Sequence, residues 1–202
     1  DLHSFPTRRS SDLRLLDFNS IYPKEEDEIR IVGVDYAFAN TLKESQKNDN
    51  TIIICVSGKW KKKRFERRLD YIELHEASDS LGAADRAREL FWLYNADYLC
   101  PDSRNGGETL FNRMTMPWDS NEKPWITQHC GLTISDKNSY HVVPETKLMD
   151  YRLRTVDQNA YPCIIPFIGT GELNSLAWIE LKQQLENNNI KFLISSQDKQ
   201  SI

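Results

Sequence analysis

Two aspartates, Asp35 and Asp102, each stand directly after a short apolar segment of the kind that forms a β-strand. The segments are Ile-Arg-Ile-Val-Gly-Val at 29–34 and Asp-Tyr-Leu-Cys-Pro at 97–101. A buried strand has no reason to end in a carboxylate unless that group lies at an exposed edge of the sheet. Two such strands side by side would bring both acids to one end of the sheet, where carboxylate oxygens suit hard divalent cations.

The chemistry of such a pair is phosphodiester hydrolysis, because two metal ions about 3.5–4 Å apart stabilise both the attacking and the leaving oxygen. We therefore expect a nuclease site with Asp35 and Asp102 as catalytic metal ligands and two Mg²⁺ or Mn²⁺ ions as cofactors. Asp49, in an Asn-Asp-Asn loop, is a candidate additional metal ligand. The alternative for all three acids is ordinary turn or capping chemistry.

A strongly basic cluster with interleaved aromatic residues is the second candidate site. The chain carries a net charge of −4, so any contact with nucleic acid must come from a local patch. The cluster is expected to form a hairpin that contacts DNA phosphates, with Trp60 stacking on a base; a solvated hairpin tip is the alternative. Its predicted DNA-binding residues are Lys59, Trp60, Lys61, Lys62, Lys63, Arg64, Arg67 and Arg68.

The hydrophobic pattern predicts an α/β protein with a mixed β-sheet flanked by helices, because strand runs alternate with helical crossovers. The stretch 117–159 is polar and indicates an irregular excursion. Trp178, Leu181 and Leu185 on the last helix are expected in the core. Strands are predicted at 29–35, 51–56, 67–76, 97–101, 161–168 and 190–194, and helices at 80–95, 108–114 and 172–187.

This order of elements resembles the RNase H-like fold, and within it the C-terminal nuclease domain of the tailed-phage terminase large subunit. The resemblance covers roughly residues 29–194, and loosely so over 117–159. The segment that ends at Asp102 is its most specific motif. The motifs are Val32-Gly-Val-Asp35, Asn48-Asp-Asn-Thr51, Tyr94-Asn-Ala-Asp-Tyr-Leu-Cys-Pro-Asp102 with the following Ser-Arg-Asn-Gly-Gly, and Gly171-Glu-Leu-Asn174 at the start of a helix.

The resemblance implies an endonuclease domain that cuts concatemeric double-stranded DNA during phage genome packaging. It implies Asp35 and Asp102 as metal ligands, and a portal and a small terminase subunit as partners of the full-length protein. The family's third acidic ligand is expected beyond Ile202, because Asp198 lies too close to the last strand. Weak or absent cleavage by the present chain is therefore expected. The family's ATPase loop, Gly-x-x-x-x-Gly-Lys-Ser/Thr, does not occur in the sequence.

The domain organisation expected from the sequence has three parts. Residues 1–13 lack any periodicity and resemble translated sequencing-adapter read-through, or else form a disordered tail. Residues 14–28 are interpreted as a linker from an upstream domain, and 29–202 as the nuclease domain, truncated at its C-terminal end. A non-catalytic module that binds DNA or a packaging partner is the alternative function. A sugar kinase or an actin-like ATPase of related fold is a third, but it needs more glycine-rich loops than Gly106-Gly107 provides.

Composition favours a cytoplasmic location. No apolar run approaches the roughly 18 residues of a membrane helix, and no secretory signal is visible. The four cysteines, Cys55, Cys100, Cys130 and Cys163, lack zinc-ligand spacing and are expected to be reduced. His75, His129 and His141 share no metal spacing either, so we expect them to be core or surface residues.

Overall fold

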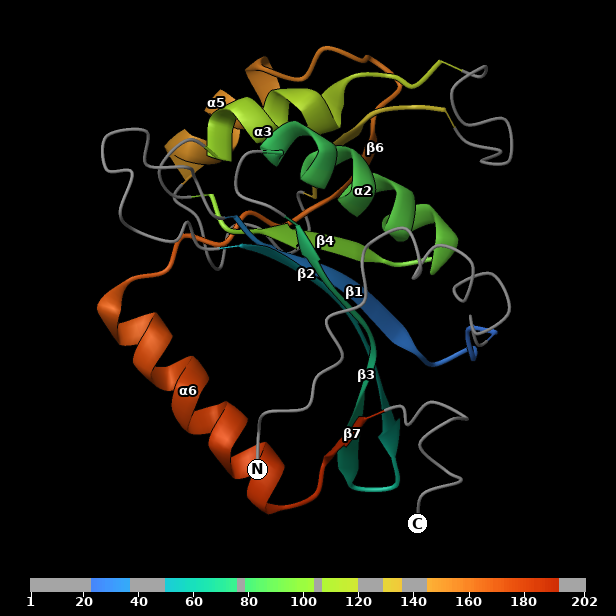
Figure 1. Cartoon of the computed structure of the whole chain (residues 1–202), viewed down its shortest axis with the longest axis vertical. Coiled ribbons are helices and arrows are strands. Elements are labelled where there is room, and N and C mark those ends of the chain that lie inside the picture. The colour runs from blue at the N-terminus through green and yellow to red at the C-terminus, as the bar shows by residue number, and fades with distance from the viewer. Residues whose placement is uncertain are drawn as a thin grey trace.

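A computed structural model of the chain describes residues 23–36, 50–75, 79–103, 107–119, 129–135 and 145–192. These residues form one mixed sheet with helices on both faces, which confirms the predicted α/β class (Figure 1). The elements are β1 (Ile29–Asp35), β2 (Thr51–Lys61), β3 (Arg64–His75), α2 (Ser80–Leu93), β4 (Tyr98–Pro101), α3 (Gly107–Thr115), β5 (Leu132–Ile134), α5 (Glu145–Leu153), β6 (Tyr161–Ile164), α6 (Gly171–Glu186) and β7 (Ile190–Phe192).

The described residues make a seven-stranded sheet in the order β5-β6-β4-β1-β2-β3-β7. β2 runs antiparallel to both of its neighbours, and every other neighbouring pair is parallel. The carboxyl ends of β1, β3, β4 and β6 therefore lie along one side of the sheet, where these strands end. The β2–β3 turn lies at the opposite ends of the strands. This arrangement separates the two candidate sites.

Helix α2 covers one face of the sheet and encloses the main core (Figure 1). Its inner side is made of small residues such as Ala83 and Ala87, which allow the helix to approach the strands closely. They pack over fully buried strand residues such as Val32, Ile53 and Leu99. Burial of this apolar surface is the main stabilising term for the fold.

The ends of α2 follow from local chemistry. The side chain of Asp79 accepts a hydrogen bond from the Gly82 amide at 3.0 Å and so caps the first turn. Asn95, the predicted stop, has a φ of 47°, a left-handed conformation that asparagine tolerates better than most residues.

The structure corrects the interpretation of residues 117–159 as irregular. This stretch contributes β5, which pairs with β6 in the sheet, and α5, whose Tyr151 packs against Phe111 of α3. Both elements are short, at three and nine residues, and the hydrophobic pattern of such short elements is weak. Their stability comes from tertiary packing.

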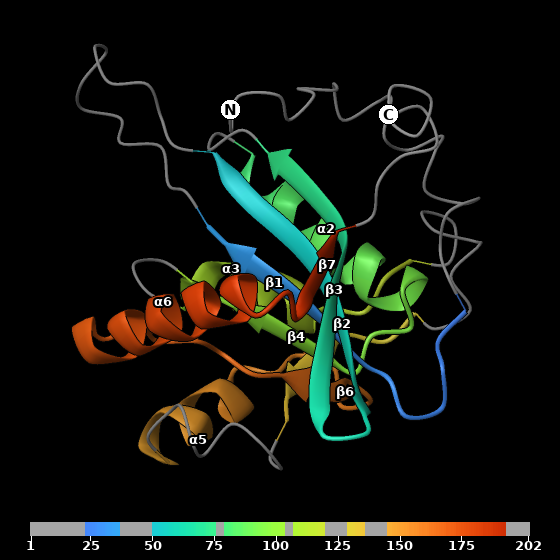
Figure 2. The same cartoon turned by 90° about the horizontal axis from the view of Figure 1, so that it is seen from below.

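Helix α6 lies on the face of the sheet opposite α2 and connects β6 to β7 across the other strands (Figures 1 and 2). The prediction that this helix is core was wrong, since none of its residues is buried. Trp178 is 71% exposed, and Leu181 and Leu185 are also exposed. An ion pair of 3.6 Å between Arg67 of β3 and Glu180 links the helix to the sheet.

Among the described residues, no helix has both the length and the apolar composition needed to cross a bilayer.

Candidate functional site

The two predicted catalytic aspartates end neighbouring parallel strands. Val34 of β1 pairs with Pro101 of β4, and the amide of Asp102 donates a hydrogen bond of 2.8 Å to the Val34 carbonyl. Asp35 and Asp102 are therefore the next residues in register. Neighbouring strands lie about 4.8 Å apart, so the two acids are adjacent at this edge of the sheet.

Both carboxylates point to the same face of the sheet. Side chains alternate along a strand, and residues in register on parallel neighbours share a face. Val34 is buried under α2, so Asp35 and Asp102 belong to the opposite face. Asp35 is exposed and Asp102 is half-buried, and both are therefore accessible to a ligand from solvent.

A third chain segment completes this edge. Asp102 forms a parallel bridge with Phe167, just beyond β6, and the Ser103 amide donates a hydrogen bond of 2.9 Å to the Phe167 carbonyl. The chain then enters α6 at Gly171, where the hydroxyl of Thr170 accepts a hydrogen bond from the Leu173 amide. The strand end that carries Asp102 is thus held between β1 and the segment after β6.

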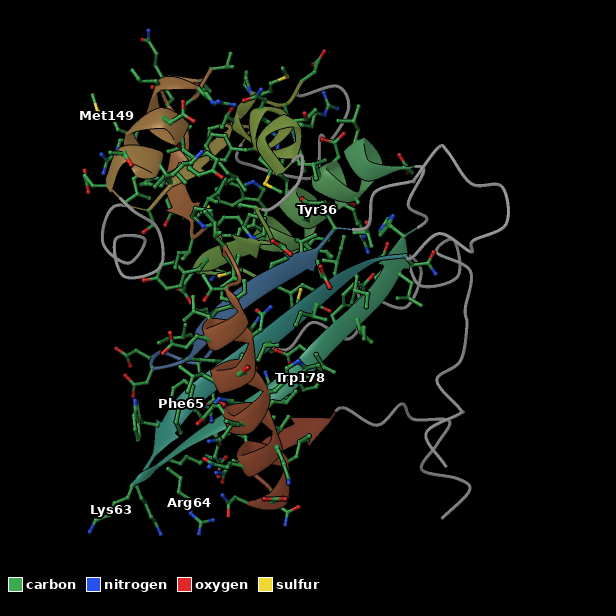
Figure 3. The ribbon with its side chains drawn as sticks, turned by 90° about the vertical axis from the view of Figure 1, so that its left-hand side faces the viewer. Tyr36, Lys63, Arg64, Phe65, Met149 and Trp178 are labelled. Carbon is green, nitrogen blue, oxygen red and sulfur yellow. The ribbon has the colours of Figure 1, made fainter. Side chains whose placement is uncertain are left out.

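The buried side of the same edge is anchored by Tyr36, the residue after Asp35. Tyr36 lies beneath α2 at the end of β1 (Figure 3). Burial, and then the nearby carboxylate of Asp85 on α2, raise the pKa of its phenol well above the ordinary value, so it is neutral. Because the Tyr36 side chain is buried against α2, it fixes the backbone at the end of β1 and with it the position of Asp35.

The acid pair suits a hard divalent cation in its ligand type, because it offers oxygen atoms only. Within the described ranges, no group of three His, Cys, Asp or Glu side chains is placed to hold a metal ion. Asp49, the predicted additional ligand, lies outside the described residues. The described residues therefore bring two carboxylates together, and their role as metal ligands stays a prediction.

The basic cluster forms the β2–β3 hairpin, as the sequence predicted. Four of its cations, on either side of the 62–64 turn, are paired with acids of the same chain, which lowers the positive potential there. The pairs are Lys59 with Glu25, Lys61 with Glu66 at 3.2 Å, Arg67 with Glu180 at 3.6 Å, and Arg68 with Glu28 at 3.0 Å and with Asp70.

The turn of the hairpin is different. Within the described part of the chain, no carboxylate forms an ion pair with Lys62, Lys63 or Arg64. Figure 3 shows the side chains of Lys63 and Arg64 projecting away from the sheet at the tip. Trp60 is 69% exposed beside them. The cations available to an external anion are therefore those of the turn.

The structure does not bring the basic turn to the acid pair. Asp35 lies opposite Ile52 at the start of β2, and Lys62 follows the end of that strand. Ten residues at about 3.3 Å each place the two sites roughly 33 Å apart. Both sites stay predictions, but they cannot contact the same phosphate group.

Sequence reasoning missed a buried polar cluster between β3 and α2. Arg86 of α2 donates a hydrogen bond of 2.9 Å to Glu73 and one of 2.8 Å to the Tyr71 hydroxyl, and Tyr71 and His75 also contact Glu73. Burial by itself raises the pKa of Glu73, but the hydrogen bonds from His75, Tyr71 and Arg86 outweigh it and lower the pKa to about 2. The signal available was the alternation of Tyr71, Glu73 and His75 on one face of a strand.

Comparison of the chain with protein-family models, with curated proteins and with solved structures finds no match. The functional assignment therefore depends on the geometry of the two sites.

Proposed function

We propose that this chain is a metal-dependent endonuclease domain with an RNase H-like fold, of the type found in the terminase large subunit of tailed phages. One observation carries the proposal: Asp35 and Asp102 end adjacent parallel strands and point to the same accessible face. The strand order supports it, because β4 lies directly beside β1 and is reached through α2.

The roles of the residues follow from their positions. Asp35 and Asp102 would hold divalent cations, and the rigid strands on either side would keep the two carboxylates at a fixed separation. When bound, Mg²⁺ or Mn²⁺ supplies neutralisation of the phosphate charge and activation of water for hydrolysis. Tyr36 would act as a positioning residue, since it holds the end of β1 under α2.

The proposed substrate is double-stranded DNA, and the proposed partners in the full-length protein are a portal and a small terminase subunit. The hairpin cations would contact the DNA backbone at a distance from the cut. Contacts of this kind would position the substrate without regard to its sequence.

The test measures metal binding and cleavage in parallel. Electron paramagnetic resonance of Mn²⁺ should show ions bound by the unaltered chain and a large loss of bound ions in Asp35→Asn and in Asp102→Asn. Asp27→Asn, in an exposed turn, is the matched control and should bind as before. Nicking of supercoiled plasmid is measured on the same variants, and the chain extended past Ile202 should be the most active form. Both Asn variants should lose nicking, and Asp27→Asn should keep it.

The proposal fails if either Asn variant binds Mn²⁺ and cleaves DNA as well as the unaltered chain does. It also fails if the unaltered chain binds no Mn²⁺ at millimolar concentration.

The second candidate is a non-catalytic module that binds DNA or a packaging partner. The observation in its favour is that the described residues provide two carboxylates and no three-ligand group. Such a module would bind DNA equally well in EDTA and would show no Mn²⁺-dependent nicking in any length of chain.

A further inference from the structure

The β2–β3 hairpin extends beyond the strands that flank it. β1 pairs with β2 as far as Gly58, and β7 pairs with β3 from Arg67 onwards. Residues between these points form a two-stranded ribbon without a neighbouring strand among the described residues. The ribbon projects from the sheet as a narrow arm (Figure 1), and residues 60–64 at its tip are exposed.

Two side-chain contacts stabilise the arm below its turn. The aromatic rings of Trp60 and Phe65 lie directly opposite each other, with centroids 5.4 Å apart and planes at 63°. The guanidinium of Arg67 lies over the Phe65 ring at 5.1 Å. This tilted contact positions the indole, yet 69% of Trp60 stays exposed.

The tip combines the two features that single-stranded nucleic acid requires. Lys62, Lys63 and Arg64 give three cations for phosphates, and Trp60 presents an aromatic surface beside them. An exposed indole can stack on an unpaired base, whereas the bases of an intact duplex are already stacked on each other. A large exposed aromatic is unfavourable on a ribbon that only needs solubility.

We propose that the hairpin tip is a binding site for single-stranded nucleic acid, in which Trp60 stacks on a base and Lys62, Lys63 and Arg64 contact the backbone. The site lies roughly 33 Å from Asp35 and is independent of metal binding. It goes beyond the proposed nuclease, because it would hold an unpaired segment at a distance from the duplex that is cut.

The experiment measures fluorescence anisotropy of a labelled 12-nucleotide oligo(dT) and of a 12-base-pair duplex, both in EDTA. Trp60→Leu keeps an apolar partner for Phe65 but removes the stacking surface, so it should weaken oligo(dT) binding about tenfold. Duplex binding should change little. Trp60→Phe should restore part of this affinity, and thermal melts should show that each variant is folded.

The charge contribution has its own matched pair of variants. Lys62→Gln/Lys63→Gln should weaken binding and reduce the slope of log affinity against log salt by about 0.7 for each single-strand phosphate that is no longer neutralised. Lys147→Gln/Lys182→Gln removes the same charge from exposed helix positions and should leave the slope unchanged.

The outcomes separate this proposal from the proposed function. Asp35→Asn should bind oligo(dT) as the unaltered chain does, whatever its effect on cleavage. Unchanged oligo(dT) affinity in Trp60→Leu would overturn the stacking site, and so would equal affinity for oligo(dT) and the duplex. Equal effects of the two lysine pairs would show that the tip contributes only to net charge.

Discussion

The buried ion pair between Glu73 and Arg86 should have a large, pH-dependent effect on stability. We consider Glu73→Gln, which keeps the size of the side chain and removes its charge. The glutamate side chain is 4% exposed and accepts a hydrogen bond from Arg86 at 2.9 Å. The substitution leaves the guanidinium buried without its counter-charge, and the loss of one partner from a buried pair is strongly destabilising.

The size of the expected loss of stability follows from the pKa of Glu73. Its pKa of about 2 in the folded protein lies about 2.5 below the ordinary 4.5. At about 1.36 kcal/mol per pKa unit, the charged carboxylate stabilises the fold by about 3 kcal/mol. For a chain of this length, that corresponds to a fall in Tm of about 6–12 °C in the glutamine variant.

The sign of the pH dependence is fixed by the direction of the shift. Because the folded-state pKa is lowered, the stabilisation is fully present above the unfolded value of 4.5. It is lost as the pH falls toward the folded value of about 2, since the native carboxylate then becomes protonated. The difference between the two proteins should therefore be constant from pH 8 to 5 and shrink below pH 4.5.

Urea unfolding followed by circular dichroism measures this difference at each pH. Glu186→Gln, at an exposed position on α6, is the control and should change the free energy of unfolding by less than about 0.5 kcal/mol. Glu73→Gln/Arg86→Met should recover part of the loss, because no charge of the pair remains buried. A loss below about 1 kcal/mol, or one that is the same at pH 7 and pH 3, would refute the reasoning.

Three further predictions concern other buried positions. Arg88→Met should lower the free energy of unfolding by about 2–3 kcal/mol in urea titrations, because the buried guanidinium donates to the Met116 carbonyl at 2.6 Å; a loss below about 0.5 kcal/mol would contradict this. Gly131→Ala should cost about 1–3 kcal/mol in the same assay, because its Cβ would overlap the Thr115 carbonyl oxygen, whereas an alanine at the open helix position 171 should cost nothing. Cys163 should stay unreactive toward a thiol reagent at pH 8 until urea unfolds the protein, because the thiol is fully buried and burial raises its pKa well above the ordinary value, and rapid native-state labelling would disprove that burial.

Part of the fold was predictable because its signals are local. β1 was predicted with its observed bounds, since its apolar run and final aspartate are contiguous in the chain. Helix α2 was predicted nearly to the residue, because its apolar positions recur at helical spacing over fourteen residues. Both elements are also buried, so local pattern and tertiary packing favour the same structure.

Other elements could not be predicted, because their stability depends on distant residues. β5 has three residues and forms only because β6 provides a pairing partner. The apolar residues of α6 predict a core helix by pattern, yet the structure buries none of them on the far face of the sheet. A hydrophobic pattern reports what a helix would bury and not whether a partner covers it.

The types of the candidate site residues follow from the sequence alone. Asp35 and Asp102 end strand-like runs, and the basic turn with Trp60 is visible as a cluster. Which of these residues lie close together depends on the tertiary structure. β4 lies beside β1 although more than sixty residues separate them, and this pairing makes Asp102 a neighbour of Asp35. The same pairing directions place the hairpin turn at the opposite end of the sheet, because an antiparallel ribbon carries its turn away from the strand ends where β1 finishes.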